Sequence, residues 1–128
     1  MLELTRRNVD NNVRSNNITS KNTIAEYWWG SGTLGHAQFD VLLIADCILP
    51  KLYPVGPLVD AIAELMAATG VCFVSYEHRL WHEFDPRHKF RELCEGKGLK
   101  VDKVSEDRLD DVYRGDDIEV WCVRWAVK

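Results

Sequence analysis

Two apolar runs do most to restrict the folds open to this chain, and both end in charged residues. They are FDVLLIAD at residues 39–46 and VCFVSYEHR at residues 71–79. A strand with one face in water alternates apolar and polar residues, whereas a parallel strand covered on both faces is apolar nearly throughout. Each run has about the length of one strand. Together they predict a sheet whose central strands are parallel and buried.

Three further strands are predicted around these runs. NTIAEYWW at residues 22–29 is rich in β-branched and aromatic residues and ends at Gly30. The sequences at 99–105 and 118–125 are the expected closing strands. Between these two lies a short polar connection, in which Tyr113-Arg114-Gly115 is expected to form a turn.

Three helices are predicted from apolar spacing and capping residues. The first is expected over about residues 2–14, and the second over 58–69, ending at Gly70, with prolines 50, 54 and 57 keeping the preceding segment non-helical. Asp85 and Pro86 are expected to begin the third, which stops near Gly96 or Gly98. The resulting order of helices and strands indicates an α/β fold.

Length and composition indicate one intracellular domain. The chain has 128 residues, and its 16 basic and 20 acidic side chains give a net charge of −4, which argues against a nucleic-acid partner. No apolar stretch reaches the roughly 18 residues of a membrane helix, and MLELTRRNVDNN is charged where a signal peptide would be apolar. We therefore expect no membrane partner and a location in the cytoplasm, with the nucleus as the alternative. The four cysteines form no CxxC pair and are expected to be free thiols.

Polar residues follow both apolar runs, at the ends where open α/β sheets bind ligands. Asp46 ends the first run, and Tyr76, Glu77 and Arg79 lie at the end of the second. If the two strands are neighbours, these side chains lie on one rim of the sheet and form a candidate site. The alternatives are that Asp46 caps a turn or helix, and that Glu77 and Arg79 form a surface ion pair of little energetic value.

The sequence does not favour two other kinds of site. His78 and His82 are four residues apart with His88 nearby, but HRLWH lacks the HExxH order of a zinc protease, so solvated loop histidines are the preferred interpretation. Gly30-Ser31-Gly32 matches neither GxGxxG nor a phosphate-binding loop. From the spacing of the histidines we therefore predict no metal site. Trp28 and Trp29, beside this loop, could stack on a flat ring, although packing is the simpler interpretation.

Five short motifs follow one another in the order of a known family. They are RNVDNN (7–12), YWWG (27–30), FDVLLIADCI (39–48), SYEHR (75–79) and DDVYRGDDIEVWCVR (110–124). With them, the chain resembles the carboxyl-terminal part of the seven-β-strand, class I S-adenosylmethionine-dependent protein-lysine methyltransferases, and most of all the valosin-containing-protein lysine methyltransferase group. The resemblance implies a partial Rossmann-like fold with an antiparallel closing hairpin. It also implies methyl transfer from S-adenosyl-L-methionine to a lysine side chain of a protein substrate.

The resemblance further implies roles for individual residues. Trp29 would line the pocket for the adenine ring, and Ala45 would touch the cofactor. Asp46 would face the site of methyl transfer, where a carboxylate can orient the lysine amine and help its proton leave. The residues that would shape the substrate side are Tyr76, Glu77 and Arg79. This reaction requires no metal.

The chain also departs from the family pattern. Leu49 stands where the family commonly has an aromatic residue, three positions after the acid. The family's first strand, its Gly-rich cofactor loop and its ribose-binding acid would precede Met1. We therefore expect residues 1–128 to form a single, incomplete methyltransferase domain that binds the cofactor weakly or not at all and is inactive without the amino-terminal half. The alternative is a non-catalytic, methyltransferase-like module that binds proteins.

The family's strand order, 3-2-1-4-5-7-6, has a consequence for the strand at 39–46. This strand would lie beside strands that the chain lacks, so that its edge would be apolar and bare, and such edges pair with other chains. Three outcomes are open: residues 22–29 pair directly with 39–46, two chains pair edge to edge, or the chain aggregates. We expect the isolated chain to self-associate through residues 39–46 or to be poorly soluble.

Overall fold

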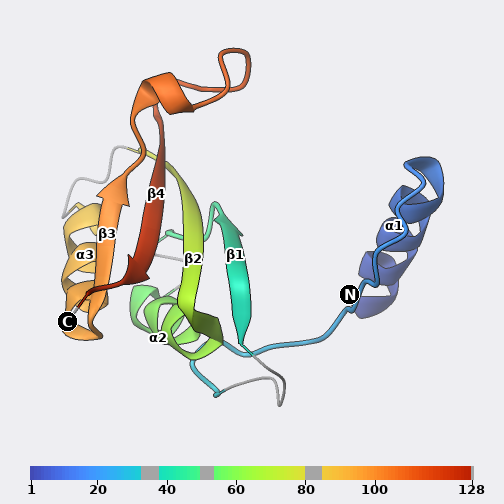
Figure 1. The fold of residues 1–128 in the computed structure, drawn as a ribbon, viewed down its shortest axis with the longest axis horizontal. Coiled ribbons are helices and arrows are strands. Elements are labelled where there is room, and N and C mark those ends of the chain that lie inside the picture. Colours follow the sequence, from blue (N-terminus) through green and yellow to red (C-terminus); the bar gives the residue numbers. More distant parts are fainter. Residues whose placement is uncertain (33–37, 50–53, 80–84, 128) are drawn as a thin grey trace.

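The computed structural model describes residues 1–32, 38–49, 54–79 and 85–127. Its centre is a four-stranded sheet in the order β1-β2-β4-β3 (Figure 1). The strands are β1 (Phe39–Ala45), β2 (Met66–Glu77), β3 (Leu99–Lys103) and β4 (Ile118–Trp125). The helices are α1 (Leu2–Ser15), α2 (Val55–Leu65) and α3 (Pro86–Gly96), with a short 3₁₀ helix, η1, at Glu106–Arg108.

The strand directions match the sequence pattern. β1 and β2 are parallel neighbours, with Leu43 opposite Phe73. β4 runs antiparallel to β2, and β3 runs antiparallel to β4. α2 lies between β1 and β2 in the chain, because a parallel connection needs a crossover. The predicted α/β fold, the parallel pairing of β1 with β2 and the antiparallel closing strands are therefore confirmed. The prediction that both apolar runs form buried central strands is wrong for β1, which lies at an edge of the described sheet with most of its residues exposed.

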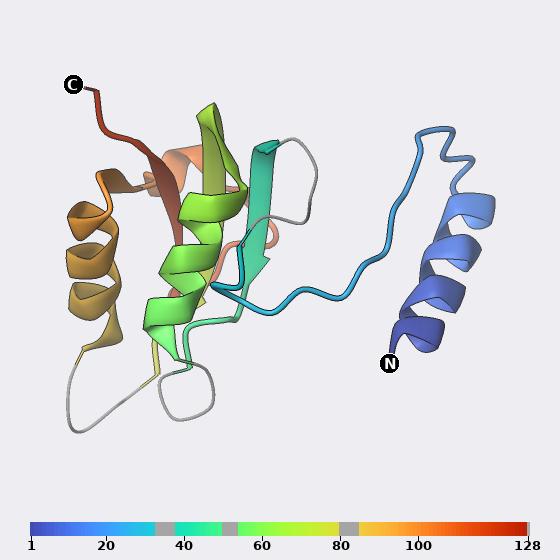
Figure 2. The same cartoon turned by 90° about the horizontal axis from the view of Figure 1, so that it is seen from below.

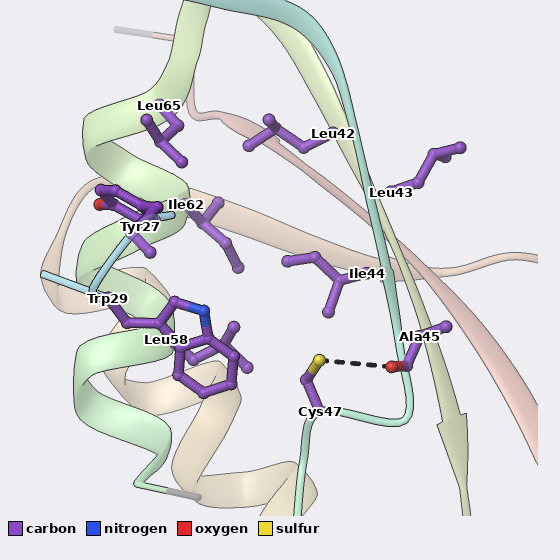
Figure 3. A pocket seen from close by; sticks show the side chains of 11 residues that line it. Tyr27, Trp29, Leu42, Leu43, Ile44, Ala45, Cys47, Leu58, Ile62 and Leu65 are labelled. Atoms are coloured by element: carbon purple, nitrogen blue, oxygen red, sulfur yellow. Dashed lines mark hydrogen bonds between the residues drawn. The ribbon is translucent and has the colours of Figure 1, made fainter. Parts of the chain in front are cut away.

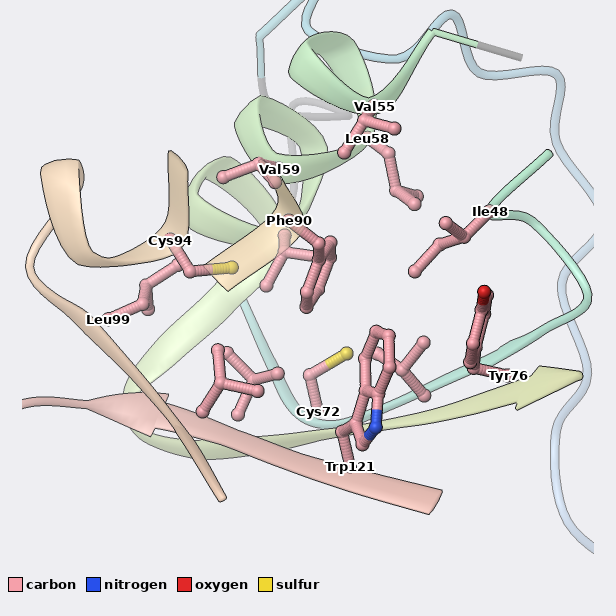
Figure 4. Close-up of a cluster of buried hydrophobic side chains, with 14 of the residues drawn as sticks. Ile48, Val55, Leu58, Val59, Cys72, Tyr76, Phe90, Cys94, Leu99 and Trp121 are labelled. Carbon is pink, nitrogen blue, oxygen red and sulfur yellow. The ribbon is translucent and has the colours of Figure 1, made fainter. Parts of the chain in front are cut away.

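Helices α2 and α3 both pack on one face of the sheet (Figures 1 and 2). Alternate residues of β2, namely Cys72, Val74 and Tyr76, are buried in the cluster that also contains apolar residues of both helices (Figure 4). The ring of Trp121 lies 4.9 Å from that of Tyr76 and 5.2 Å from that of Phe90, between centroids. The core therefore lies on one side of the sheet, and no helix of the described residues covers the other side.

Helix α1 stands apart from the sheet. It spans Leu2–Ser15, close to the predicted 2–14, but none of its residues is buried. Figures 1 and 2 both show an extended connection between α1 and the sheet. The apolar stripe of Leu2, Val9 and Val13 predicted the helix correctly. The core is formed without it.

The strand predicted at 22–29 is wrong. Residues 21–28 carry no strand, and the part of the chain that the structure describes shows no ladder between them and β1. A β-rich composition makes a strand only where a neighbour supplies hydrogen bonds, and β-propensity depends strongly on such context. Direct pairing of this segment with 39–46, one of the three outcomes left open, is therefore not formed among the described residues.

The start and end of the second helix differ from the prediction. α2 begins at Val55, with Pro54 as its N-cap and Pro57 in its first turn. Proline is tolerated there, because the first backbone N–H groups of a helix have no partner within it. α2 ends at Leu65, and the residues expected to finish the helix instead begin β2.

Gly70 belongs to β2 and does not end a helix. A Cβ at this position would lie 3.0 Å from the backbone oxygen of Phe39 and 2.9 Å from the side chain of Met66. Glycine in a strand often marks such a close approach of backbone. The register between β1 and β2 also shifts here, between Phe39 and Val41 of β1. Gly70 is therefore explained by the close contact of the two parallel strands.

The third helix begins and ends where the sequence predicted. Asp85 is its N-cap and accepts a hydrogen bond from the backbone N–H of Arg87 at 3.0 Å, with Pro86 as the first helical residue. α3 ends at Gly96, and Gly98 has a φ of +82°, a conformation that glycine adopts without strain. Among the described residues, none of the helices has both the length and the apolar character to cross a membrane.

Candidate active site

Asp46 lies at the carboxyl end of β1 in an unusual backbone conformation. Its φ is +52°, in the left-handed region that few residues other than glycine, asparagine and aspartate adopt. Its backbone N–H still donates to Ser75 of β2 at 3.3 Å, so the sheet holds the residue on its amino-terminal side. The chain then turns inward to the buried Ile48 and Leu49. The turn leaves the Asp46 carboxylate exposed at the rim of the sheet.

Three of the predicted rim residues form one charged cluster. Arg79 Nη2 donates to Glu77 Oε2 at 2.9 Å and reaches both carboxylate oxygens of Asp46 at 3.4 Å. All three side chains are well exposed, so these contacts add little to stability. The pKa of Arg79 is raised first by its hydrogen bond to Glu77. Two carboxylates around one guanidinium leave the cluster with an excess of negative charge. Arg79 lies farther from the Asp46 oxygens than from Glu77 Oε2.

Tyr76 lies elsewhere, although it was predicted beside these residues. It is 2% exposed and belongs to the core, where its ring stacks on Trp121 (Figure 4). Burial raises the pKa of its hydroxyl, whose oxygen lies 3.5 Å from His78 Nδ1. Successive strand residues point to opposite faces, and so Tyr76 points away from its neighbour Glu77. Its proposed role on the substrate side remains a prediction.

A cavity of about 260 Å³ lies between α2, β1 and residues 27–29 (Figure 3). Trp29 and Ala45, the two residues predicted to contact a cofactor, both line it. The indole of Trp29 projects into the space between α2 and β1 (Figure 3). The other lining residues are Tyr27, Leu42, Leu43, Ile44, Cys47, Leu58, Ala61, Ile62 and Leu65. Ala45 also precedes Asp46, so the cavity adjoins the charged rim.

Glu64 of α2 fixes the wall that carries Trp29. Its Oε2 accepts hydrogen bonds from the Tyr27 hydroxyl at 2.9 Å and from the Gly32 backbone N–H at 3.0 Å. These two bonds bracket residues 27–32, which we call the aromatic segment. Burial raises the pKa of Tyr27, and the hydrogen bond and charge of Glu64 raise it further. No local pattern predicts this role of Glu64, because Tyr27 and Glu64 lie 37 positions apart.

The cavity suits one part of S-adenosylmethionine. Flat, apolar walls with an indole fit an adenine ring, and the volume lies slightly below the usual range of about 300–1,000 Å³ for ligand pockets. None of the described lining residues carries a charge, so no carboxylate among them can accept from ribose hydroxyls. These residues therefore fit the adenine end of the cofactor, and the rest of the molecule needs further contacts.

Two further points of the sequence analysis concern Leu49 and the possibility of a metal site. Leu49, at the position of the family's aromatic residue, is 8% exposed and so belongs to the core. Among the residues described, there is no group of three or more histidine, cysteine or acidic side chains that could hold a metal ion. His82, which the zinc alternative needs, lies outside the described residues.

Comparisons with known proteins agree with the fold. A precorrin-6y C5,15-methyltransferase from Geobacter metallireducens matches with a TM-score of 0.58 at 16% identity, over 95% of this chain and 60% of that one. A TehB-like S-adenosylmethionine-dependent methyltransferase from Corynebacterium glutamicum matches with a TM-score of 0.53 at 18% identity, over 76% and 53%. The chain thus spans less than two thirds of either structure.

Searches with the sequence itself place the chain in a family. No curated protein matches it. A family model described as lysine methyltransferase matches residues 1–94, which is most of the chain. The observed sheet, in which β1 and β2 are parallel and the other pairs are antiparallel, is consistent with the Rossmann-like methyltransferase structures. The chain belongs to the lysine methyltransferase family and has part of the class I methyltransferase fold.

Proposed function

We propose that this chain is the carboxyl-terminal portion of an S-adenosylmethionine-dependent protein-lysine N-methyltransferase, related to the valosin-containing-protein group. The observation that carries the proposal is the adjacency of Ala45 and Asp46 at the end of β1. Ala45 lines the apolar cavity, and Asp46 presents its carboxylate at the rim. A methyl donor bound through the cavity and an amine held at Asp46 would therefore meet at one place.

The cofactor would be held by the aromatic segment and β1. Trp29 would stack on the adenine ring, with Ala45 and the apolar residues of α2 closing the pocket. When bound, S-adenosylmethionine supplies the methyl group of its sulfonium. Since the transfer is an in-line displacement, positioning the amine is most of what the protein contributes.

Asp46 is proposed as the residue that positions the lysine amine. A lysine ammonium has no lone pair and must lose a proton before it attacks, and a carboxylate at the site can accept that proton directly or through water. The excess negative charge of Asp46, Glu77 and Arg79 favours a cationic side chain at this rim. Arg79 makes its shorter contact with Glu77, which leaves the Asp46 oxygens at 3.4 Å only loosely held.

The described residues supply only part of a cofactor site. The cavity offers no charged group to the ribose or to the amino acid end of S-adenosylmethionine. We therefore include in the proposal that residues 1–128 alone transfer no methyl group, and that a preceding segment with a Gly-rich loop completes the enzyme. Its substrate would be a protein in the cytoplasm or nucleus.

The test uses the product of the longest reading frame that contains this chain. It is incubated with radiolabelled S-adenosylmethionine and a protein extract, and label on lysine is measured. We expect transfer by the wild type and a loss of at least about tenfold in Asp46→Asn, with an unchanged melting temperature. Asp40→Asn is the matched control, because Asp40 is also an exposed acid of β1 but lies at its other end. Full activity in Asp46→Asn would return Asp46 to the role of a turn residue.

The second candidate is a non-catalytic module that binds proteins through the same rim. The partial cavity and the buried Leu49 favour it, because an aromatic wall around the amine is not provided at that position. The transcript separates the two candidates. An in-frame Gly-rich strand and loop before Met1 supports the enzyme, whereas a 5′ end that encodes no such unit supports the binding module.

A further inference from the structure

A second cavity, of about 300 Å³, lies between α3, β3 and β4, and we call it the α3 cavity. It is at the end of the sheet opposite to β1 (Figure 1). The strands that would precede this chain in the family's sheet belong beside β1, at the other edge. The titratable side chains that line the cavity are Asp85, Arg87, His88, Arg91, Lys103 and Glu119. The proposed methyl transfer uses none of them.

The described lining of the α3 cavity carries more positive than negative charge. Three cations and two acids line it, so an excess positive charge is present even with His88 neutral. The chain as a whole has a net charge of −4. The cavity therefore differs in sign from most of the molecule, and a local excess of one sign attracts ligands of the other.

Both acids of the α3 cavity are already held by partners. Asp85 caps α3 and accepts from Arg87 Nε at 3.0 Å and from Arg87 Nη2 at 2.8 Å. Glu119 accepts from Arg87 Nη1 at 3.1 Å and from the indole N–H of Trp121 at 2.8 Å. Burial alone would raise the pKa of Glu119, but the bond from Trp121 and the charges of Lys103 and Arg87 outweigh it and lower the pKa. Both carboxylates are therefore ionised, and they occupy the guanidinium of Arg87.

Arg91 has no acidic partner among the described residues. Its Nη1 donates to the backbone oxygen of Val101 in β3 at 2.6 Å. This bond fixes the guanidinium between α3 and β3, and it leaves Nε and Nη2 without an acceptor in the described part of the chain. These two nitrogens form the side of a guanidinium that can donate to two oxygens of one carboxylate or phosphate.

Two other side chains can supply further donors to the cavity. Lys103 reaches Glu119 only at 3.6 Å and is 54% exposed, so its ammonium has donors to spare. The ring of His88 also lines the cavity and can donate a hydrogen bond. Beneath them, Phe90 and Trp121 pack against each other in the core, which gives the donors a rigid base.

From these observations we propose that the α3 cavity binds a small-molecule anion, through a phosphate or carboxylate group held by Arg91, Lys103 and His88. The cavity beside Trp29 offers no charged group among its described lining residues, and the rim at Asp46 is negative, so an anion is disfavoured at both places. This site does not depend on the methyl transfer proposed above. Because its cations are partly exposed to solvent, we expect a dissociation constant of about 1–10 mM.

Nuclear magnetic resonance on the product of the longest reading frame that contains this chain tests the proposal. Inorganic phosphate and malonate are titrated separately at constant ionic strength, because a change in screening alone would alter the spectrum. The reporter is the indole N–H of Trp121, whose acceptor Glu119 lines the cavity. We expect a saturable shift with at least one of the two anions, and the tighter of them identifies the group that the site prefers.

Three variants locate the binding. Arg91→Met should weaken it at least about tenfold, since the two-oxygen contact is lost. Lys103→Met should weaken it about threefold, because its charge is more exposed. This variant also serves if Arg91→Met, which removes the bond to Val101, does not fold. Arg108→Met is the matched control, because it removes the same charge from an exposed arginine of η1, outside the cavity.

Three results overturn the proposal. One is the absence of a saturable shift with either anion up to about 50 mM, well above the expected dissociation constant. Another is an unchanged affinity in every folded variant of Arg91 and Lys103, which would place the anion elsewhere. The third is an equal loss of affinity in Arg108→Met, which would show that only the overall charge of the protein matters.

Discussion

Removing the carboxylate of Glu64 should detach the aromatic segment from α2 without unfolding the sheet. Glu64→Ala deletes the acceptor of two hydrogen bonds, from the Tyr27 hydroxyl at 2.9 Å and from the Gly32 backbone N–H at 3.0 Å. Among the described residues, neither of these two donors has a second acceptor. The packing of Trp29 against the cavity wall would remain.

The size of the effect follows from these two bonds. A buried hydrogen bond to a charged group contributes about 1.5–3 kcal/mol, and Glu64 is only half-buried, so we take about 1 kcal/mol for each. A total of about 2 kcal/mol corresponds to a roughly 30-fold increase in the population of the open segment. The pKa of Tyr27 should also fall, because the hydrogen bond and charge of Glu64 raise it, while the larger effect of burial remains.

Hydrogen exchange measured by mass spectrometry reports the opening directly. Protection of the Gly32 amide should fall by about 30-fold in Glu64→Ala. Glu64→Gln should lose less, because its amide oxygen still accepts a hydrogen bond without the charge. Glu95→Ala, an exposed acid of α3, is the control and should change nothing. Unaltered Gly32 protection in a folded Glu64→Ala protein would show that Glu64 does not hold the segment.

The remaining predictions concern the cofactor, the thiols and acid stability. Calorimetry on residues 1–128 should detect no S-adenosylmethionine binding with a dissociation constant below about 1 mM. Two or three missing hydrogen bonds at about 1.5–3 kcal/mol each weaken the affinity by about three orders of magnitude or more. A micromolar dissociation constant would refute this prediction. Burial raises the pKa of both Cys72 and Cys94 to about 12, so a thiol reagent at pH 8 should label them only after denaturation. The hydrogen bond from Arg87 lowers the pKa of Asp85 from 3.8 to about 2. That stabilisation is complete above pH 4 and is lost as the pH falls to 2, by about 1 kcal/mol for a partly exposed pair. Arg87→Met should flatten the pH dependence of urea unfolding in this window, and an unchanged slope would contradict the assignment.

The features that the sequence predicted well are those set by local chemistry. The Asp85-Pro86 pair signalled a helix start through an N-cap and a residue that needs no backbone donor. Asp46 at the end of an apolar run was placed on the rim because parallel strands end at a common edge. From that edge alone, the meeting of Asp46, Glu77 and Arg79 could be expected, and the three do meet.

The features that the sequence missed depend on distant partners. Residues 22–29 have a strand-like composition, but a strand needs a neighbouring ladder, and here Tyr27 instead donates to Glu64 of α2. Gly70 follows a helix-like apolar pattern and was therefore expected to end a helix. Only the approach of the Phe39 backbone shows why a glycine stands there. Tyr76 differs from Glu77 by a single step along β2, and this step moves its side chain from the rim to the core.

The two faces of β1 have different surroundings because its side chains alternate. Leu42 and Ile44 point toward α2 and line the cavity, whereas Leu43 points away from the helix (Figure 3). A strand paired with the free edge of β1 would therefore hold β1 in place without filling the space beside Trp29. Since Asp46 follows directly on this strand, fixing β1 also limits the motion of the carboxylate. In the enzyme proposed above, the preceding strands of the family's sheet would supply that pairing, so the segment that completes the cofactor site would also fix β1 and the position of Asp46.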